Sequence, residues 1–173
     1  AHGGATDLWG GVWTAADINA ANFGAALASI KAGTAGGART VSVDHMSISV
    51  DYTLPPPTVL SINLASTNPT NPNTSVDWTV TFDQSVTGVD AADFLLVPGG
   101  SVTGASITGV TGSGTTWTVT ANTGSGTGTL GLNLVDDDTI AAGALKLGGT
   151  GAGNGNFTGQ VYTVEAPMTC ITD

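Results

Sequence analysis

The amino-acid sequence predicts an all-β protein built as an antiparallel β-sandwich. Residues 75–82 read Ser-Val-Asp-Trp-Thr-Val-Thr-Phe, so polar and apolar side chains alternate strictly. A period of two places the apolar side chains on one face of an extended strand and the polar ones on the other. The same alternation recurs at residues 116–120 and 130–134. Clusters of glycine, proline and asparagine separate these segments, as turns do.

The charge of the chain excludes several classes of partner. Only 9% of the 173 residues are charged, against about 25% in an average soluble domain. The net charge is −10, and the three basic residues, Lys31, Arg39 and Lys146, are far apart in the sequence. Nucleic-acid binding needs a basic patch, so we expect none, and an anionic membrane surface is disfavoured for the same reason. No run of 18 apolar residues is present, so no membrane insertion is expected.

The composition also indicates a compartment. Cys170 is the only cysteine, so no disulfide can form within the chain. Few cysteines and lysines with abundant Thr, Gly and Asn are typical of secreted bacterial surface proteins. The first residues carry no signal-peptide pattern. We therefore expect an extracellular, cell-surface protein, present as a mature or excised piece of a longer product.

Three consecutive prolines, Pro55 to Pro57, mark the clearest boundary in the chain. Proline lacks an amide donor and favours an extended conformation, so such a stretch serves as a short, stiff spacer. We divide the chain into an N-terminal β segment (1–54), a proline-rich linker (55–58), a sandwich (59–164) and a tail (165–173).

The sandwich segment has the pattern of an immunoglobulin-like fold, which consists of about seven short strands separated by turn signals. Turn residues lie at 68–73, 98–100, 111–114 and 124–126, and residues 91–93 could form one helical turn. The glycine-rich residues 143–159 are expected to form a long loop. The predicted strands are residues 59–64, 76–82, 94–96, 101–110, 115–121, 130–135 and 160–164.

Residues 1–54 are too few to form a second sandwich. Residues 14–17 are expected to form a capped helical turn, and two strands are expected at 23–30 and 38–53. The second strand changes its apolar face near Asp44-His45, which indicates a bulge. Two strands cannot bury their own apolar surface, so this segment must pack on the sandwich segment, on sequence upstream of residue 1, or on another chain. The predicted contact residues are Trp9, Trp13, Phe23, Ile48, Val50 and Tyr52.

Several stretches of the sandwich segment match a known repeat. They include Pro-Pro-Thr-Val at 56–59, Val-Asp-Trp-Thr-Val-Thr-Phe at 76–82, Leu-Val-Asp-Asp-Asp at 134–138 and Leu-Gly-Gly-Thr-Gly at 147–151. On these stretches, residues 56–165 resemble the bacterial Ig-like modules of large secreted surface proteins and adhesins. Residues 7–10, 13–14, 17–19, 22–24 and 43–45 resemble the C-terminal end of another secreted β-sandwich module. The resemblance implies a structural or adhesive role, since such repeats often serve as spacers.

Asp136, Asp137 and Asp138 form the candidate cation site. Three adjacent carboxylates repel one another, and Ca²⁺ accepts Asp and backbone oxygens in loops. Asp90 and Asp93 could contribute if their loop lies at the same end of the module. The alternative is a solvated turn after a strand. The complete Asp-x-Asp-x-Asp-Gly calcium loop is absent from the sequence.

No residues are predicted to be catalytic or to bind a cofactor. The sequence has no Gly-x-Ser-x-Gly elbow, and we interpret His45 as a structural residue at the bulge. Trp78 and Trp117 alternate with other apolar residues and are expected in the core. Trp9 and Trp13 could instead stack on sugars, although tryptophan more often buries its large surface in a core or interface.

The leading hypothesis is an extracellular structural or adhesive protein that is not an enzyme. We expect it to be the subunit of a surface filament, with copies of itself as partners and strands shared between subunits. The alternative is a carbohydrate-binding module of a secreted enzyme, with a glycan as ligand.

Overall fold

A computed structural model of the chain describes residues 14–18, 20–21 and 53–167. The chain divides into two units, Ala1–Thr53 and Leu54–Asp173. In the first unit, helix α1 (Ala15–Ile18) is a single turn, as predicted. Its capping box is complete: the Thr14 amide donates to Asp17 Oδ2 at 2.9 Å, and the Asp17 amide donates to Thr14 Oγ1 at 3.2 Å.

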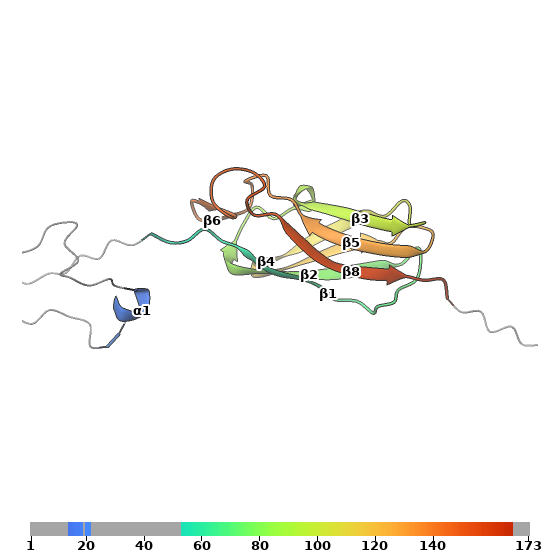
Figure 1. Cartoon of the computed structure of the whole chain (residues 1–173), viewed down its shortest axis with the longest axis horizontal. Helices are drawn as coiled ribbons and strands as arrows, with labels where there is room; N and C mark the ends of the chain where they lie inside the picture. The colour runs from blue at the N-terminus through green and yellow to red at the C-terminus, as the bar shows by residue number, and fades with distance from the viewer. Residues whose placement is uncertain (1–13, 19, 22–52, 168–173) are drawn as a thin grey trace, which may run out of the picture. The chain divides into compact units, whose positions relative to one another are not determined.

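The second unit is an antiparallel sandwich, which confirms the predicted all-β class (Figure 1). One sheet has the strand order β1-β2-β4 and the other β3-β5-β8. Strands β6 and β7, with two residues each, form a short hairpin, and η1 is one turn of 3₁₀ helix. Among the described residues, no helix is long and apolar enough to cross a membrane. The bounds are β1 Val59–Leu64, β2 Ser75–Val86, η1 Ala91–Asp93, β3 Phe94–Gly100, β4 Ser106–Asn122, β5 Gly128–Leu134, β6 Ala141–Ala142, β7 Leu145–Lys146 and β8 Phe157–Val164.

Some predicted boundaries were wrong. The expected turn at 98–100 lies inside β3, where Gly99 and Gly100 pair with Thr129 and Gly128 of β5. Pro98 is tolerated there because β3 is an edge strand, which does not need every amide donor. The expected loop at 143–159 contains β7 and the beginning of β8.

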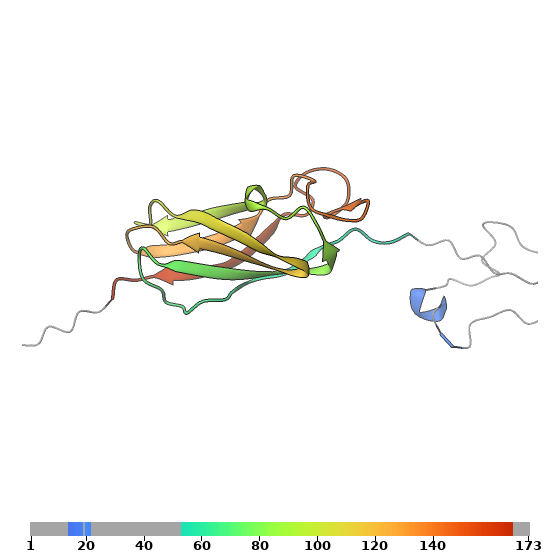
Figure 2. The ribbon, with the colours of Figure 1, turned by 180° about the vertical axis from the view of Figure 1, so that it is seen from behind.

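Strand β4 reverses direction within its own length (Figure 2). A straight strand would separate Thr108 from Thr120 by about 40 Å. Instead, the Thr108 hydroxyl donates to the Thr120 carbonyl at 3.2 Å. A Cβ built on Gly112 would also lie only 2.7 Å from Trp117 Cα. The chain therefore turns near Gly114 (φ 67°), and β4 has two antiparallel arms, as the predicted turn at 111–114 requires.

The two arms of β4 continue the register of β3 and β5. The pairing between β3 and β5 has no shift from Phe94↔Leu134 to Gly100↔Gly128, and the bridge Thr103↔Ser125 extends the same register. Thr108 and Thr120 keep the same register. Residues 94–134 thus form one long hairpin, which passes from one sheet to the other near residues 104 and 124.

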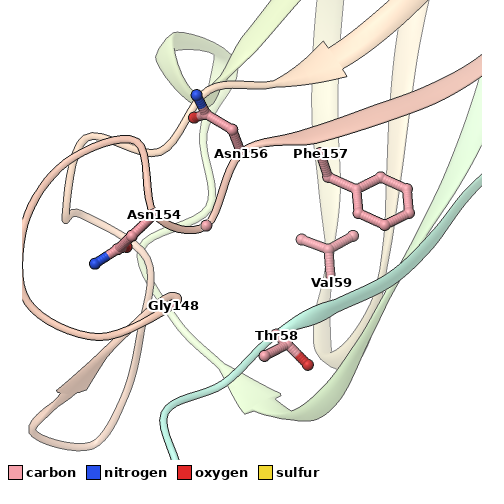
Figure 3. Close-up of a pocket in the computed structure, with 7 residues that line it drawn as sticks. Thr58, Val59, Gly148, Asn154, Asn156 and Phe157 are labelled. Atoms are coloured by element: carbon pink, nitrogen blue, oxygen red, sulfur yellow. The ribbon is translucent and has the colours of Figure 1, made fainter.

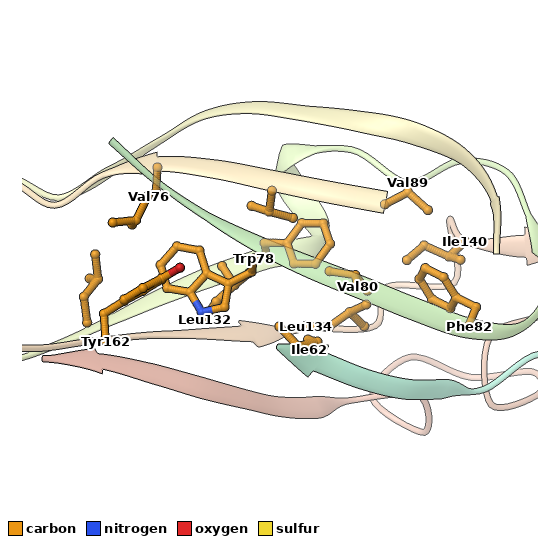
Figure 4. Packing of buried hydrophobic residues seen from close by; sticks show 14 of the residues in the cluster. Ile62, Val76, Trp78, Val80, Phe82, Val89, Leu132, Leu134, Ile140 and Tyr162 are labelled. Atoms are coloured by element: carbon orange, nitrogen blue, oxygen red, sulfur yellow. The ribbon is translucent and has the colours of Figure 1, made fainter. Parts of the chain in front are cut away.

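The core lies between the two sheets (Figure 4). The alternating residues of β2 and β5 point inward, and each of them is at most 1% exposed. The residues that form this row are Val76, Trp78, Val80 and Phe82 from β2 with Leu130, Leu132 and Leu134 from β5. The period-two pattern of the sequence therefore becomes the buried face of each strand.

Trp78 and Tyr162 join the two sheets at the centre of this core. Their ring centroids lie 4.9 Å apart in an edge-to-face arrangement. The Trp78 indole donates to the Gln160 carbonyl at 3.0 Å, from β2 to β8. The Tyr162 hydroxyl donates to the Asp77 carbonyl at 2.6 Å and accepts from the amides of Ala65 and Ser66 at 3.1 and 2.7 Å. Both rings are fully buried, yet each polar atom has a partner.

One side of the sandwich is closed by β1 and β8, which run in the same direction. The Leu64 amide donates to Gln160 Oε1 at 3.0 Å. Farther along, Thr70 and Val164 form a parallel bridge, and the Glu165 amide donates to the Thr70 carbonyl at 2.8 Å. Because β1 opens the module and β8 ends it, the chain enters at one end of the sandwich and leaves at the other (Figure 1).

The proline-rich residues lie against the sandwich at the entry end. The Pro57 carbonyl accepts from the Gly148 amide at 2.9 Å, and Pro57 is buried. The Gln84 side chain donates to the Pro55 carbonyl at 3.0 Å, and the Thr58 amide donates to Asp83 Oδ1 at 2.7 Å. These contacts fix the direction in which the chain enters the module.

We predict that Gly124→Ala destabilises the module more than Gly104→Ala does. Both glycines have φ near +70°, which costs an alanine about 1–2 kcal/mol. A Cβ on Gly104 meets nothing within 4 Å, whereas a Cβ on Gly124 would overlap the Thr103 carbonyl oxygen. The expected extra loss is ~1–3 kcal/mol in the free energy of unfolding, measured with urea. Equal losses would show that the backbone around Gly124 is not packed more closely than the backbone around Gly104.

We also predict that Tyr162→Phe lowers the free energy of unfolding by about 1–3 kcal/mol, because the Ser66 amide loses its acceptor. The control is Thr129→Val, which removes an exposed hydroxyl and should change stability by less than about 0.5 kcal/mol. Urea unfolding followed by tryptophan fluorescence measures both. A Tyr162→Phe variant as stable as the wild type would mean that this hydroxyl does not hold the sheets together.

Candidate functional site

Five of the eight acidic residues between positions 53 and 167 lie at the end of the module where β5 finishes. Asp136, Asp137 and Asp138 follow β5, Asp90 is the N-cap of the short helix η1, and Asp93 is the last residue of that helix. The Val135 amide donates to the Asp93 carbonyl at 2.8 Å, so the two acidic segments lie side by side. The structure therefore brings the predicted cation residues together with Asp93.

Asp136 holds the glycine-rich loop through both its side chain and its backbone. The carboxylate is 3% exposed and accepts from the amides of Asp138 and Gly155, each at 3.1 Å. The Asp136 amide donates to Asn156 Oδ1 at 2.7 Å, and its carbonyl accepts from Gly153 at 2.9 Å. These partners account for the burial of a carboxylate, since each buried oxygen has a hydrogen bond.

Asp138 and Asp137 accept hydrogen bonds from two different segments that follow the acidic turn. Both carboxylate oxygens of Asp138 accept from the Gly151 amide, at 3.2 and 3.0 Å, and Asp138 itself has φ 68°. Asp137 is exposed and accepts from the amide and hydroxyl of Thr139. These hydrogen bonds lower the pKa of Asp137. The three adjacent carboxylates thus point to different partners.

Thr139 lies between two carboxyl groups. Its hydroxyl is 2.8 Å from Asp93 Oδ1 and also within hydrogen-bonding distance of Asp137 Oδ1. One hydroxyl has one proton, so it can donate to only one of the two at a time. Asp93 is 1% exposed, and burial raises its pKa despite a 2.7 Å hydrogen bond from the Asp90 amide. As the pH falls, Asp93 therefore takes up a proton before Asp137 does, and a protonated Asp93 can donate to Thr139.

A shallow hollow lies beside this loop, next to the entry of the chain (Figure 3). Its walls come from the start of β1, the glycine-rich loop and the start of β8. No charged side chain lines it. The lining residues are Thr58, Val59, Gly148, Asn154, Gly155, Asn156 and Phe157.

The arrangement is suited to holding loops rather than to binding a metal. Within residues 14–18, 20–21 and 53–167, no group of three or more His, Cys, Asp or Glu side chains is placed to hold a metal ion. The carboxylates of Asp136 and Asp138 instead bind backbone amides, which orders a loop that has few side chains of its own. Calcium binding by Asp136, Asp137 and Asp138 stays a prediction. The described part of the chain contains no group of side chains arranged to hold the ion.

The predicted contact residues lie outside the described residues, as do His45 and Cys170. They are Trp9, Trp13, Phe23, Ile48, Val50 and Tyr52. The two other tryptophans are predicted in the core, and the structure confirms this fully for Trp78. Trp78 is fully buried, and Trp117 is partly buried against the core.

Three residues organise the module in ways that the sequence does not predict. Asp93 is predicted as a possible cation ligand, but its carboxylate caps η1 and contacts Thr139. Neither Asn156 nor Tyr162 is predicted from the sequence to organise the module. The spacing Asp90-Ala-Ala-Asp93 matches a capping box and could have identified the first, whereas nothing local indicates the long-range contacts of the other two.

Comparison of the chain with protein-family models, with curated proteins and with solved structures found no match.

We predict that replacing Asp93 changes how stability depends on pH. In the wild type, the raised pKa of Asp93 means that stability falls as the pH rises from about 3.8 through the folded-state pKa. Asp93→Asn keeps an acceptor for the Asp90 amide and a donor for Thr139, but it cannot titrate. Relative to the wild type, this variant should therefore gain stability as the pH rises through that window.

The measurement is urea unfolding of both proteins from pH 3 to pH 7, with Asp93→Ala as the control for lost contacts. Asp93→Ala should be less stable than Asp93→Asn by about 1–3 kcal/mol at every pH, because neither variant titrates at residue 93 and only alanine leaves the Asp90 amide without an acceptor. A difference between the wild type and Asp93→Asn that is the same at every pH would contradict the interpretation.

Proposed function

We propose that this chain is an extracellular structural or adhesive protein, a subunit of a bacterial surface filament built from Ig-like modules. The observation that carries the proposal is the position of the two ends of the module. Residues 53–58 enter at one end of the sandwich, and residues 165–167 leave at the opposite end (Figure 2). A module of this kind adds its full length to a chain of modules, which is what a spacer or filament requires.

The order of the strands supports the Ig-like part of the proposal. In an Ig constant-type sandwich, one sheet has the order A-B-E-D and the other C-F-G. Here the first sheet has the order β1-β2-β4, with the first arm of β4 beyond the second, and the other sheet has the order β3-β5-β8. Numbered along the chain as A to G, these strands match that order.

Both junctions of the module are bonded to the sandwich, which favours a defined angle between successive modules. At entry, Thr58 is bonded through its amide and its hydroxyl to Asp83, at 2.7 and 2.9 Å. At exit, the Glu165 amide is bonded to Thr70. Because the chain is bonded to the module at both ends, the orientation of one module restricts the orientation of the next.

Assembly would use residues 1–54. The proposed contacts are Trp9, Trp13, Phe23, Ile48, Val50 and Tyr52, because an apolar segment of this length cannot bury its own side chains. Strand sharing between subunits is one way to cover such a segment, since an added strand satisfies the free edge of a sheet.

We predict that the full chain forms filaments visible by negative-stain electron microscopy, and that a chain lacking residues 1–54 does not. The truncated chain keeps the whole sandwich, so its circular dichroism should retain the β signal. A full chain without filaments would contradict the proposed assembly. Filaments from the truncated chain would show that the contact lies elsewhere.

The carbohydrate-binding alternative rests on Trp9 and Trp13, which could stack on a sugar. A glycan array separates the two proposals. Under the alternative, the wild type binds at least one glycan, and Trp9→Ala or Trp13→Ala abolishes that signal. The structural proposal predicts no signal that depends on either tryptophan.

A further inference from the structure

The outer face of sheet β3-β5-β8 exposes four large apolar side chains. Leu95 and Val97 of β3 are 55% and 44% exposed, and Val161 of β8 is 48% exposed. Val135, which continues the alternation one step beyond β5, is 39% exposed. These four make up the apolar patch, and they are four of the six exposed large hydrophobic residues in the described part of the chain.

Gly131 joins the patch into one surface. Val97, Gly131 and Val161 are paired neighbours on three adjacent strands. A Cβ on Gly131 would lie 3.3 Å from Val161 Cγ2 and 3.6 Å from Val97 Cβ, so the two valines lean over the glycine and bury it. Val97, Gly131 and Val161 therefore cross the width of the sheet without a polar side chain, whereas Asn133 lies between Gly131 and Val135.

The strands that carry the patch contain no Asp, Glu, Lys or Arg. Strand β2 of the other sheet, in contrast, contains Asp77 and Asp83, and the acidic turn lies at one end of the module. In a chain of net charge −10, most contacts between two copies bring like charges together. Contact through this sheet face does not, because both surfaces are neutral.

We propose that a second copy of this chain packs on the apolar patch, face to face. Neutral apolar surfaces match themselves, so a symmetric contact needs no opposite charge on the partner. Addition of a strand at the free edge of β3 is less suited, because Pro98 lacks the amide that a ladder would use. This inference deepens the proposed function, since it names a second contact between copies that is separate from residues 1–54.

The size of the face sets the strength of the contact. Three strands about 4.8 Å apart, with seven or eight residues each and a rise of about 3.4 Å per residue, give a face of ~25 by 15 Å. This is about half of the ~800 Å² per partner that stable interfaces bury. A single contact is therefore weak and concentration-dependent, and it becomes effective where filaments already hold many copies side by side.

Sedimentation velocity of the full chain over a range of concentrations tests the proposal, because filaments sediment far faster than dimers and the two are resolved in one run. The wild type should show a reversible monomer–dimer equilibrium. Val161→Glu and Val97→Glu should each weaken dimerisation by at least ~10-fold, because each places a carboxylate against apolar surface and against its symmetry mate.

Leu60→Glu is the matched control. Leu60 is 59% exposed and lies on β1, in the other sheet. The substitution adds the same charge to a similar side chain, so dimerisation should change less than about twofold. Urea unfolding of all three variants shows whether each one remains folded.

Two results would overturn the inference. One is a wild type that stays monomeric at every concentration outside its filaments. The other is a dimer that Val161→Glu and Val97→Glu weaken no more than Leu60→Glu does. That result would show that the copies do not contact each other through the apolar patch. The proposed filament is tested separately, since filaments without the dimer, or the dimer without filaments, each contradict only one of the two proposals.

Discussion

The module depends on the contact between Trp78 and Tyr162. The two rings fill the space between the sheets, and their polar atoms bond to backbone groups of the facing strand and of the segment that follows β1. That segment then pairs Thr70 with Val164, which closes the side of the sandwich. Because β1 and β8 run in the same direction along this side, the chain enters and leaves the module at opposite ends. A tyrosine hydroxyl with one donor bond and two acceptor bonds is fully used, so it specifies one arrangement of three segments.

Most carboxylates of the module contact turns or loops, whereas Asp77 lies within β2 and accepts from the Thr120 hydroxyl of β4. Asp136 and Asp138 bind amides of the glycine-rich loop, Asp93 caps η1, and Asp83 holds Thr58 at the entry. Glycine-rich loops have little side-chain packing, so a carboxylate that accepts two amides replaces the missing contacts. This use of aspartate in turns and loops agrees with the absence of charged residues from strands β3, β5 and β8.

The sequence predicts what is periodic and local, and it does not predict what is long-range. Strict alternation identified the buried faces of β2 and β5, and the turn at 111–114 was correctly predicted even though its two arms form one continuous element. The extent of β3 was missed because Pro98 and two glycines look like a turn, and only pairing with β5 shows otherwise. At the candidate site, three adjacent aspartates suggested a shared cation. Their separate partners, Gly155, Thr139 and Gly151, are 12 or more residues away in two of three cases and leave no pattern in the sequence.

We propose that this protein acts by assembly, because the sandwich has its two ends at opposite poles and strands without charged residues in one sheet, while the chain carries a net charge of −10. The most direct test is the average molar mass of the full wild-type chain, measured by static light scattering as a function of concentration and salt. A neutral contact between acidic copies predicts a mass that rises with concentration and rises further with added salt, because salt screens the repulsion. A monomeric mass under all conditions, or association that salt weakens, would contradict the account.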